Sequence, residues 1–270
     1  MDRGCRNPVK KQRWDKQNRL FQCGFSLIEL LVVVSIVGLM LTIVVPALEK
    51  AKTRVRNVTC QSNLRQWSLS FTMYVEDNNG SFPAAGRNWI QDLAPYYEES
   101  QGLLCCPLAT TTAESGEGGP FDAYEDRTVE YGGEPVKGSY GLNGWITNVS
   151  SEYPAIFEKP TTSNWRKIQS ENASNVPILM DSLWVVAYPD VTNTPPEIEG
   201  NGFCSPNGQY QMRHFCFDRH GNGTINGLFM DMSYHPVGLK ELWRLKWHRN
   251  TDLTYPLPKW PDWMKSYKEY

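Results

Sequence analysis

The chain has one long apolar stretch, which lies near its N-terminus. Between Leu30 and Val45 the sequence is apolar except for small residues and Thr42. A run of about 16 residues is short for a membrane span, which needs roughly 20. Extending the segment to Phe25 and Leu48 gives the required length and places one acid, Glu29, near its start. We therefore predict a membrane-spanning helix over residues 25–48.

Helical spacing of apolar residues continues beyond this segment to about Val75. Pro46 removes one helical hydrogen bond, so we expect a kink there rather than a helix end. Residues 49–77 should then lay one apolar stripe on a β-sheet. The stripe comprises Val55, Val58, Leu64, Trp67, Phe71 and Tyr74.

The sequence Asp77-Asn78-Asn79-Gly80 has the composition of a turn and should end this helix. Its oxygen-rich side chains also allow a calcium loop. We favour the turn, because no complete loop with a terminal bidentate acid follows.

The remaining residues predict a β-rich domain. Segments 176–181 and 184–188 are rich in β-branched and aromatic residues and should be strands. Residues 219–235 predict a hairpin, and 239–249 a short amphipathic helix. Residues 109–138 are rich in Gly, Thr, Glu and Pro and predict a loop insertion on the surface, and 189–208 predict a second loop.

The charge is distributed unevenly. The first 24 residues hold seven basic and two acidic groups, which leaves 20 basic and 27 acidic residues in the rest of the chain. The basic leader should stay in the cytoplasm, and a long folded domain translocates despite the basic residues that follow the apolar segment. The acidic body argues against a nucleic-acid partner, since phosphate binding requires basic patches.

Three interpretations of the N-terminus compete. A removed secretory signal peptide would need a cut near Val45-Pro46-Ala47, and both Pro46 and the acid at the start of the apolar core disfavour it. An ordinary signal anchor is the second interpretation, and it gives Glu29 no purpose. The third depends on the residues Gly24-Phe25-Ser26-Leu27-Ile28-Glu29 and the aliphatic run that follows them.

These residues resemble the prepilin signature of type IV pilins and type II secretion pseudopilins. The resemblance implies cleavage by prepilin peptidase between Gly24 and Phe25, followed by methylation of the Phe25 amine. Glu29 is then the fifth mature residue, where the family places its assembly glutamate. It could neutralise the amine of an adjacent subunit, since buried charges persist when they are paired. Gln22-Cys23 departs mildly from the family, in which a basic residue commonly precedes the glycine.

The resemblance extends into the body of the chain. Cys60, the Asn63-Leu64-Arg65-Gln66 run, the Asp77–Gly80 turn and Cys106-Pro107 follow the order of large pseudopilin-like proteins. Those relatives also carry a C-terminal motif of His, nine residues and Asp-Gly.

The corresponding residues here are a degenerate form of that motif. Ten residues separate His220 from Asp231, and Met232 replaces the glycine. A positive φ is costlier for methionine than for glycine, so the turn should differ locally. These departures weaken any transfer of function to His220 and Asp231.

Taken together, the resemblance implies an α+β, pilin-like fold in which a long N-terminal helix packs on an antiparallel sheet. The expected parts are a cleaved leader (1–24), a membrane or filament-core helix (25–48), its continuation (49–77) and a head (78–270). The function would be structural and not enzymatic, as a subunit of a type II secretion pseudopilus or a type IV pilus-like filament. The alternative is a membrane-anchored adhesive or glycan-binding module.

The resemblance also implies partners and a location. The partners would be prepilin peptidase, other pseudopilin subunits and the inner-membrane assembly platform. Before assembly the chain would cross the inner membrane once, with the N-terminus in the cytoplasm and the head in the periplasm or, within the filament, outside the cell.

The cysteines and tryptophans allow other chemistry, which we consider weaker. No Cys-x-x-Cys pair occurs, and outside the cytoplasm disulfides are the default. We expect a Cys204–Cys216 bridge, and a second from Cys60 to Cys105 or Cys106. One possible set of metal ligands is disfavoured by its spacing; it comprises Cys204, His214, Cys216 and His220. No other cofactor is expected. No nucleophile motif indicates a hydrolase, and the ten tryptophans should be core residues rather than a sugar-binding face.

Overall fold

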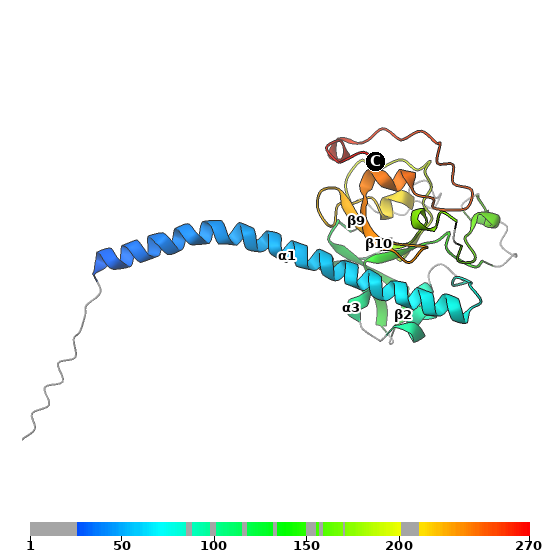
Figure 1. Ribbon diagram of the computed structural model, residues 1–270, viewed down its shortest axis with the longest axis horizontal. Helices are drawn as coiled ribbons and strands as arrows, with labels where there is room; N and C mark the ends of the chain where they lie inside the picture. The colour runs from blue at the N-terminus through cyan, green and yellow to red at the C-terminus, as the bar shows by residue number, and fades with distance from the viewer. Residues whose placement is uncertain are drawn as a thin grey trace, which may run out of the picture. The chain divides into compact units, whose positions relative to one another are not determined.

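The computed structural model describes residues 26–84, 88–97, 101–114, 118–131, 134–149, 155–156, 159–169, 171–200 and 211–270. It divides the chain into two compact units, Met1–Glu49 and Lys50–Tyr270. One helix, α1 (Leu27–Asp77), contributes to both (Figure 1).

In the first unit, α1 exposes its apolar side chains. Between Leu27 and Val45 the large hydrophobic residues are 49% to 86% exposed. The hydroxyls of Ser35 and Thr42 donate to backbone carbonyls of the preceding turn, at 2.7 Å each, so these polar groups need no outside partner. The helix is long and apolar enough to cross a membrane. It continues through Pro46, so the proline does not end it.

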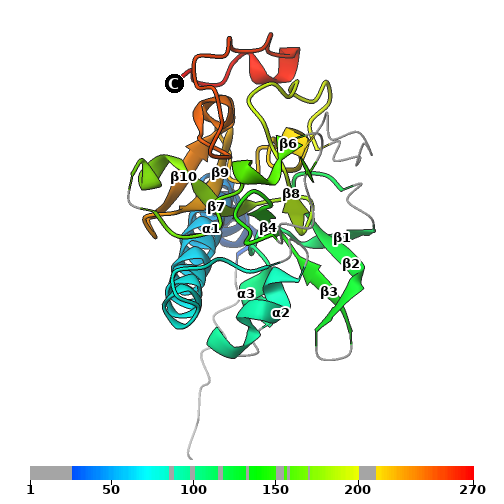
Figure 2. The same ribbon diagram turned by 90° about the vertical axis from the view of Figure 1, so that its right-hand side faces the viewer.

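In the second unit, α1 buries a stripe of side chains from Cys60 to Val75. The indole of Trp67 donates to the carbonyl of Leu103 at 3.1 Å and packs edge-on against Trp89, with ring centroids 5.0 Å apart. Phe71 stacks on the same Trp89. These contacts attach the helix to α2 (Trp89–Leu93) and α3 (Gln101–Leu104), which lie beside it in Figure 2.

The predicted stripe is therefore correct for its C-terminal part and wrong for its beginning. Leu64, Trp67 and Phe71 are fully buried, whereas Val55 and Val58 are 65% and 66% exposed. Helical spacing gives the face of a helix but not the residue at which a neighbour begins to cover it.

The main sheet has five strands in the order β10-β9-β7-β4-β8 (Figure 2). All neighbouring pairs are antiparallel except β4 and β8, which are parallel. The α+β, pilin-like class is thus confirmed. The strand bounds are β4 (Tyr140–Asn143), β7 (Pro177–Asp181), β8 (Val186–Ala187), β9 (Thr224–Phe229) and β10 (Tyr234–Gly238).

Strand β7 is central to this sheet, and all five of its residues are buried. Its last residue is an acid, Asp181, which is fully buried as well. A carboxylate in such a position requires partners, because an unpaired buried charge is strongly unfavourable.

The prediction of a loop insertion over 109–138 is wrong in secondary structure. Three strands form a second sheet there, in the order β1-β2-β3, with bounds β1 (Thr111–Glu114), β2 (Asp122–Tyr131) and β3 (Glu134–Gly138). Strand pairing supplies the order that the composition of the segment does not indicate.

The smaller elements complete the fold. Strands β5 (Ala155–Ile156) and β6 (Lys159–Pro160) pair with each other. The helix expected over 239–249 is a shorter 3-10 helix, η5 (Leu239–Arg244). The other 3-10 helices are η1 (Ala94–Tyr96), η2 (Thr161–Ser163), η3 (Ala173–Asn175), η4 (Gln211–His214) and η6 (Asp262–Met264).

The tryptophans of the described residues belong to the core or its edge. Several of them also fix irregular backbone, because each buried indole N–H needs an acceptor. Trp145 donates to the carbonyl of Pro189, Trp243 to that of Asn193 and Trp263 to that of Pro196. The irregular segment after β8 is thus held from inside, and the core interpretation of these tryptophans is confirmed.

Two predicted turns are present. At the end of α1, Asn79 and Gly80 take φ values of 54° and 79°, and the amide of Gly80 donates to the carbonyl of Val75 at 2.8 Å. This left-handed ending is typical of helix C-termini. In the predicted hairpin, β9 and β10 are joined through Met232, whose φ is 64°.

Replacement of Met232 should reveal this backbone strain. A left-handed conformation costs a residue with a Cβ about 1–2 kcal/mol, whereas glycine adopts it freely. We expect the Met232→Gly protein to be more stable than the Met232→Ala protein by about 1 kcal/mol, measured by denaturant unfolding of the full chain in detergent. Comparing these two variants removes the lost packing of the methionine side chain. If alanine proved the more stable, as it is in ordinary strand or helix positions, the strain would be absent.

Candidate functional site

The first candidate site is the start of α1. The amide of Ser26 donates to Oε2 of Glu29 at 2.9 Å, and the amide of Ile28 donates to Oγ of Ser26 at 3.4 Å. This is the reciprocal pattern of a capping box, and it places a carboxylate at the positive end of the helix. Glu29 is exposed. Gly24 and Phe25, the expected cleavage and methylation residues, lie outside the described residues.

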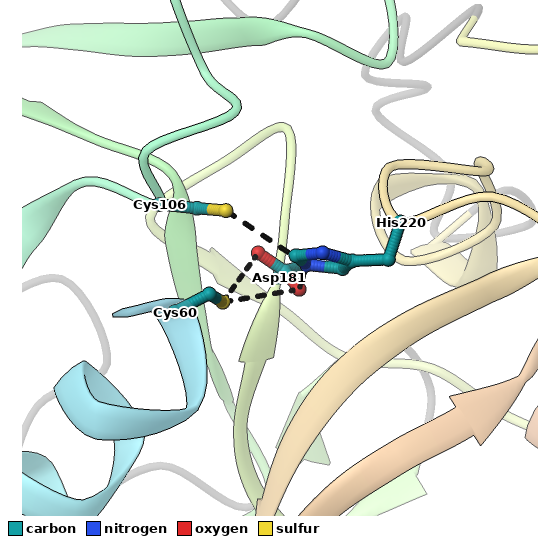
Figure 3. Close-up of side chains that lie close together, drawn as sticks. All are labelled: Cys60, Cys106, Asp181 and His220. Atoms are coloured by element: carbon teal, nitrogen blue, oxygen red, sulfur yellow. Dashed lines mark hydrogen bonds and ion pairs between the residues drawn. The ribbon is translucent and has the colours of Figure 1, made fainter. Parts of the chain in front are cut away.

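The second candidate site is a buried cluster in the head (Figure 3). One ligand atom from each of four side chains lies within 4.8 Å of all the others. The four come from α1, the segment after α3, the end of β7 and the segment before β9, and all are buried; they are Cys60, Cys106, Asp181 and His220.

The carboxylate of Asp181 is at the centre of this cluster. Its Oδ2 lies 2.8 Å from Nε2 of His220 and accepts the amide N–H of Asn226 at 2.8 Å. Its Oδ1 lies 3.4 Å from the guanidinium of Arg219. Burial alone raises the pKa of Asp181, but His220 and Arg219 outweigh burial and hold that pKa below its ordinary value. The carboxylate is therefore ionised.

Arg219 supplies a fixed positive charge behind Asp181. Its guanidinium is fully buried and faces the carboxylate of Asp181. It also donates to three backbone carbonyls at distances of 2.7 to 2.9 Å. The three acceptors belong to Pro120, Asp122 and Ser139. Because arginine cannot be deprotonated in proteins, this charge is permanent.

The two thiols have different surroundings. Sγ of Cys60 accepts a hydrogen bond from the buried hydroxyl of Tyr140 at 3.2 Å, and burial raises the pKa of Cys60. Sγ of Cys106 lies 3.8 Å from Nε2 of His220. Burial raises the pKa of Cys106, but hydrogen bonds from Cys60 and His220 lower it to about 7 overall.

His220 is the fourth member of the cluster. Burial lowers its pKa, but the charge and hydrogen bond of Asp181 raise it to about 9 overall. Its Nε2 also lies 3.0 Å from the side-chain nitrogen Nδ2 of Asn226, while its Nδ1 is buried with no hydrogen-bond partner among the described residues.

This geometry does not resemble a cysteine–histidine–aspartate catalytic relay. In such a relay the nucleophile contacts one ring nitrogen and the carboxylate orients the other. Here both Cys106 and Asp181 face the same nitrogen of His220. The side chains instead converge on one point, which is the arrangement of a ligand-binding cluster.

The structure separates the remaining candidate residues. Cys60, Cys105, Cys106 and Cys216 are free thiols, so the expected bridge from Cys60 is not formed here. Cys105 points to the carbonyl of Lys137, and Cys216 contacts the sulfur of Met264 at 3.8 Å. Cys204 lies outside the described residues, so its expected bridge to Cys216 stays a prediction.

His220 and Asp231 have different surroundings. Asp231 is exposed, and its Oδ1 accepts the amide and hydroxyl hydrogens of Ser233, which stabilises the hairpin turn. His220 joins the buried cluster instead. The sequence contained no spacing that links His220 to Cys60 or Asp181, because these residues are brought together only by the packing of α1 on the sheet.

Comparison with protein-family models locates one match, the prokaryotic N-terminal methylation motif, at residues 19–45. This segment includes Glu29 and most of the exposed apolar part of α1. The chain carries this motif at the start of a long apolar helix, as type IV pilin-like proteins do. The resemblance inferred from Gly24–Glu29 is thus confirmed, and the motif is that of a membrane-anchored, pilin-type subunit processed by prepilin peptidase. Comparisons with curated proteins and with solved structures gave no match.

His214, a possible metal ligand by sequence, lies outside the cluster. Its burial should make the stability of the head depend on pH. Burial first, and then the charge of Arg213, lower its pKa to about 4. The unfolded chain, with a histidine pKa of about 6.5, binds the proton more readily, so stability falls as pH drops from about 6.5 to 4, by about 3 kcal/mol.

We therefore expect the His214→Gln protein to lose less stability than the unsubstituted chain over this range. Denaturant unfolding of the full chain in detergent at pH 7, 5.5 and 4.5 measures the difference. Parallel pH curves for the two proteins would contradict the inference.

Proposed function

We propose that the processed chain is a structural subunit whose N-terminal helices bundle into a filament, either a type II secretion pseudopilus or a type IV pilus-like fibre. The observation that carries the proposal is the surface of α1. From Leu27 to Val45 it is exposed and apolar, and it belongs to the matched methylation motif. Lipid covers such a helix before assembly, and neighbouring helices would cover it afterwards.

Glu29 supports assembly over simple anchoring. A carboxylate in the middle of a bilayer costs about 2.5–3.5 kcal/mol on the insertion scale, and less near an interface. A lipid anchor gains nothing in return. Cleavage after Gly24 creates a cationic amine on Phe25, and the amine of an adjacent subunit can pair with the carboxylate of Glu29.

Capping alone does not require an acid at this position. Glutamine accepts the amide hydrogen of the first residue in a capping box as glutamate does. The hydrogen bond from Ser26 to Glu29 therefore accounts for a polar side chain that accepts hydrogen bonds. The negative charge of Glu29 is left to pair with a group outside this helix. Capping and charge pairing can therefore be separated by experiment.

The charge pattern supports one orientation. The basic leader would remain in the cytoplasm, where prepilin peptidase has access to the bond after Gly24. The head, Lys50–Tyr270, would lie in the periplasm or on the filament surface. Other pilin-type subunits and an inner-membrane assembly platform would be its partners. The rival glycan-binding role finds little support in the described tryptophans, since Trp67, Trp89 and Trp145 are buried.

Charge and capping at Glu29 can be tested separately in the producing cell. We expect Glu29→Gln to reduce sheared filaments about tenfold or more, because losing about 1.4 kcal/mol at one subunit contact is already tenfold. Glu29→Ala should do the same. Glu49→Gln, which neutralises another acid on the same helix, should assemble normally. Filaments are measured by shearing and electron microscopy, and the membrane fraction verifies that each variant is inserted.

The result for glutamine decides between the roles. If Glu29→Gln assembled normally and only Glu29→Ala failed, Glu29 would act as a helix cap and the charge-pairing proposal would be wrong. Normal assembly by both variants would favour a helix that serves as an anchor alone.

A further inference from the structure

The buried cluster in the head has a chemical role that the proposed filament function does not explain. We propose that it is a closed, four-coordinate Zn²⁺ site, with ligands Sγ of Cys60, Sγ of Cys106, Oδ2 of Asp181 and Nε2 of His220. All four residues lie in the second unit, so the proposal is independent of filament assembly.

Two edges of the cluster are close to those of a tetrahedral ion, and a third is shorter. With Zn–S bonds near 2.3 Å and Zn–N or Zn–O bonds near 2.0–2.1 Å, the edges of the tetrahedron are about 3.3 to 3.8 Å. Sγ of Cys60 lies 3.8 Å from the carboxylate oxygens of Asp181, and Sγ of Cys106 lies 3.8 Å from Nε2 of His220. The His220–Asp181 edge is 2.8 Å, so a bound ion would lengthen it by about half an ångström.

The contacts at Nε2 of His220 conflict when they are treated as hydrogen bonds alone. Asp181 faces this nitrogen with an acceptor, and Asn226 faces it with an amide donor. One ring nitrogen either donates or accepts, so it cannot satisfy both. The opposite nitrogen, Nδ1, has no partner among the described residues. A cation bound by both Nε2 and Oδ2 would let each of these atoms offer a lone pair to it, and the side-chain amide of Asn226 keeps Oδ1 of Asn57 as its acceptor at 2.8 Å.

The charges also balance. Two thiolates, one carboxylate and a neutral imidazole give the bound Zn²⁺ site a net charge of −1. The buried guanidinium of Arg219, 3.4 Å from Oδ1 of Asp181, offsets that charge. The hydroxyl of Tyr140 donates to Sγ of Cys60 and would stabilise its thiolate. Such outer contacts orient the ligands of metal sites. Binding would release the thiol protons to solvent.

The ligand types favour zinc over other divalent ions. Calcium and magnesium prefer sites made of oxygen atoms, whereas two sulfurs with one imidazole favour zinc. All four positions are filled by protein atoms, which is the arrangement of a structural site rather than a catalytic one. A surface pocket of about 420 Å³, lined in part by Arg56, Arg219 and His220, would provide a route for the ion.

The site would fasten together segments that are distant in sequence. Cys60 belongs to α1, Cys106 follows α3, Asp181 ends β7, and His220 precedes β9 (Figure 3). The ion would therefore fix the helix against both the sheet and the segment after α3. Because such a site does not exist in the unfolded chain, its binding free energy contributes to folding.

The test uses the full chain in detergent, purified with reducing agent and supplied with Zn²⁺ or Co²⁺. We expect one zinc per chain by elemental analysis after desalting. The Co²⁺ form should show the sulfur-to-metal charge-transfer and visible bands of a tetrahedral site with two thiolates. A chelator should lower the melting temperature of the Zn²⁺ form, and added Zn²⁺ should restore it.

Two neighbouring cysteines provide matched variants. Cys106→Ala should abolish stoichiometric zinc and weaken the Co²⁺ charge-transfer band. Cys105→Ala removes the adjacent thiol, which faces the carbonyl of Lys137, and should keep both signals. The unsubstituted chain carries the decisive measurement, so the test does not depend on whether Cys106→Ala folds.

Two results would overturn the proposal. One is a folded, reduced chain that binds less than one metal per ten molecules and shows no Co²⁺ charge-transfer band. The other is a pair of findings. A Cys60–Cys106 disulfide is mapped by peptide mass in the chain isolated without reductant, and after reduction added zinc does not protect these two thiols from a thiol reagent.

Discussion

The structure depends on one constraint, which is that the two parts of helix α1 need different surroundings. From Leu27 to Val45 its side chains are apolar and exposed, whereas from Cys60 to Val75 its buried stripe is covered by the head. The second part is stabilised within the chain by contacts such as Trp67 on Trp89. The first must be covered by lipid or by other subunits, since large exposed apolar surfaces are unfavourable in water. Insertion into a membrane would meet this requirement, and so would the assembly that we propose.

The head is built around the covered part of that helix. The central strand β7 brings the buried carboxylate of Asp181 close to Cys60 of α1, and Arg219 pairs with the same carboxylate. A reduced, metal-bound cluster would account for these buried charged groups without assigning catalysis to them. The filament contacts that we propose belong to the exposed apolar part of the helix.

The sequence predicted those features that depend on local patterns. The prepilin signature, the helix through Pro46 and the left-handed ending at Gly80 each follow from adjacent residues. The replacement of the motif's glycine by Met232 predicted a local difference in the turn, and Met232 takes a φ of 64° there. Such features need no knowledge of what packs against them.

Other features depend on distant contacts and could not be obtained in this way. The strands of 109–138 depend on pairing between segments, which the Gly-, Thr-, Glu- and Pro-rich composition of this stretch does not indicate. The exposure of Val55 reflects where the head begins to cover α1. The cluster was missed because Cys60 and Asp181 are 121 residues apart, with no ligand spacing to connect them. The metal set considered from spacing contained only one of its members, His220.

Intact mass and N-terminal sequencing of the chain isolated from membranes test whether prepilin peptidase cleaves this chain after Gly24 and its new amino terminus is methylated. We expect a chain that begins at Phe25 and is heavier than the unmodified polypeptide by one methyl group on its amine. A chain that still begins at Met1, or one that begins at Leu48 after signal-peptide removal, would contradict it.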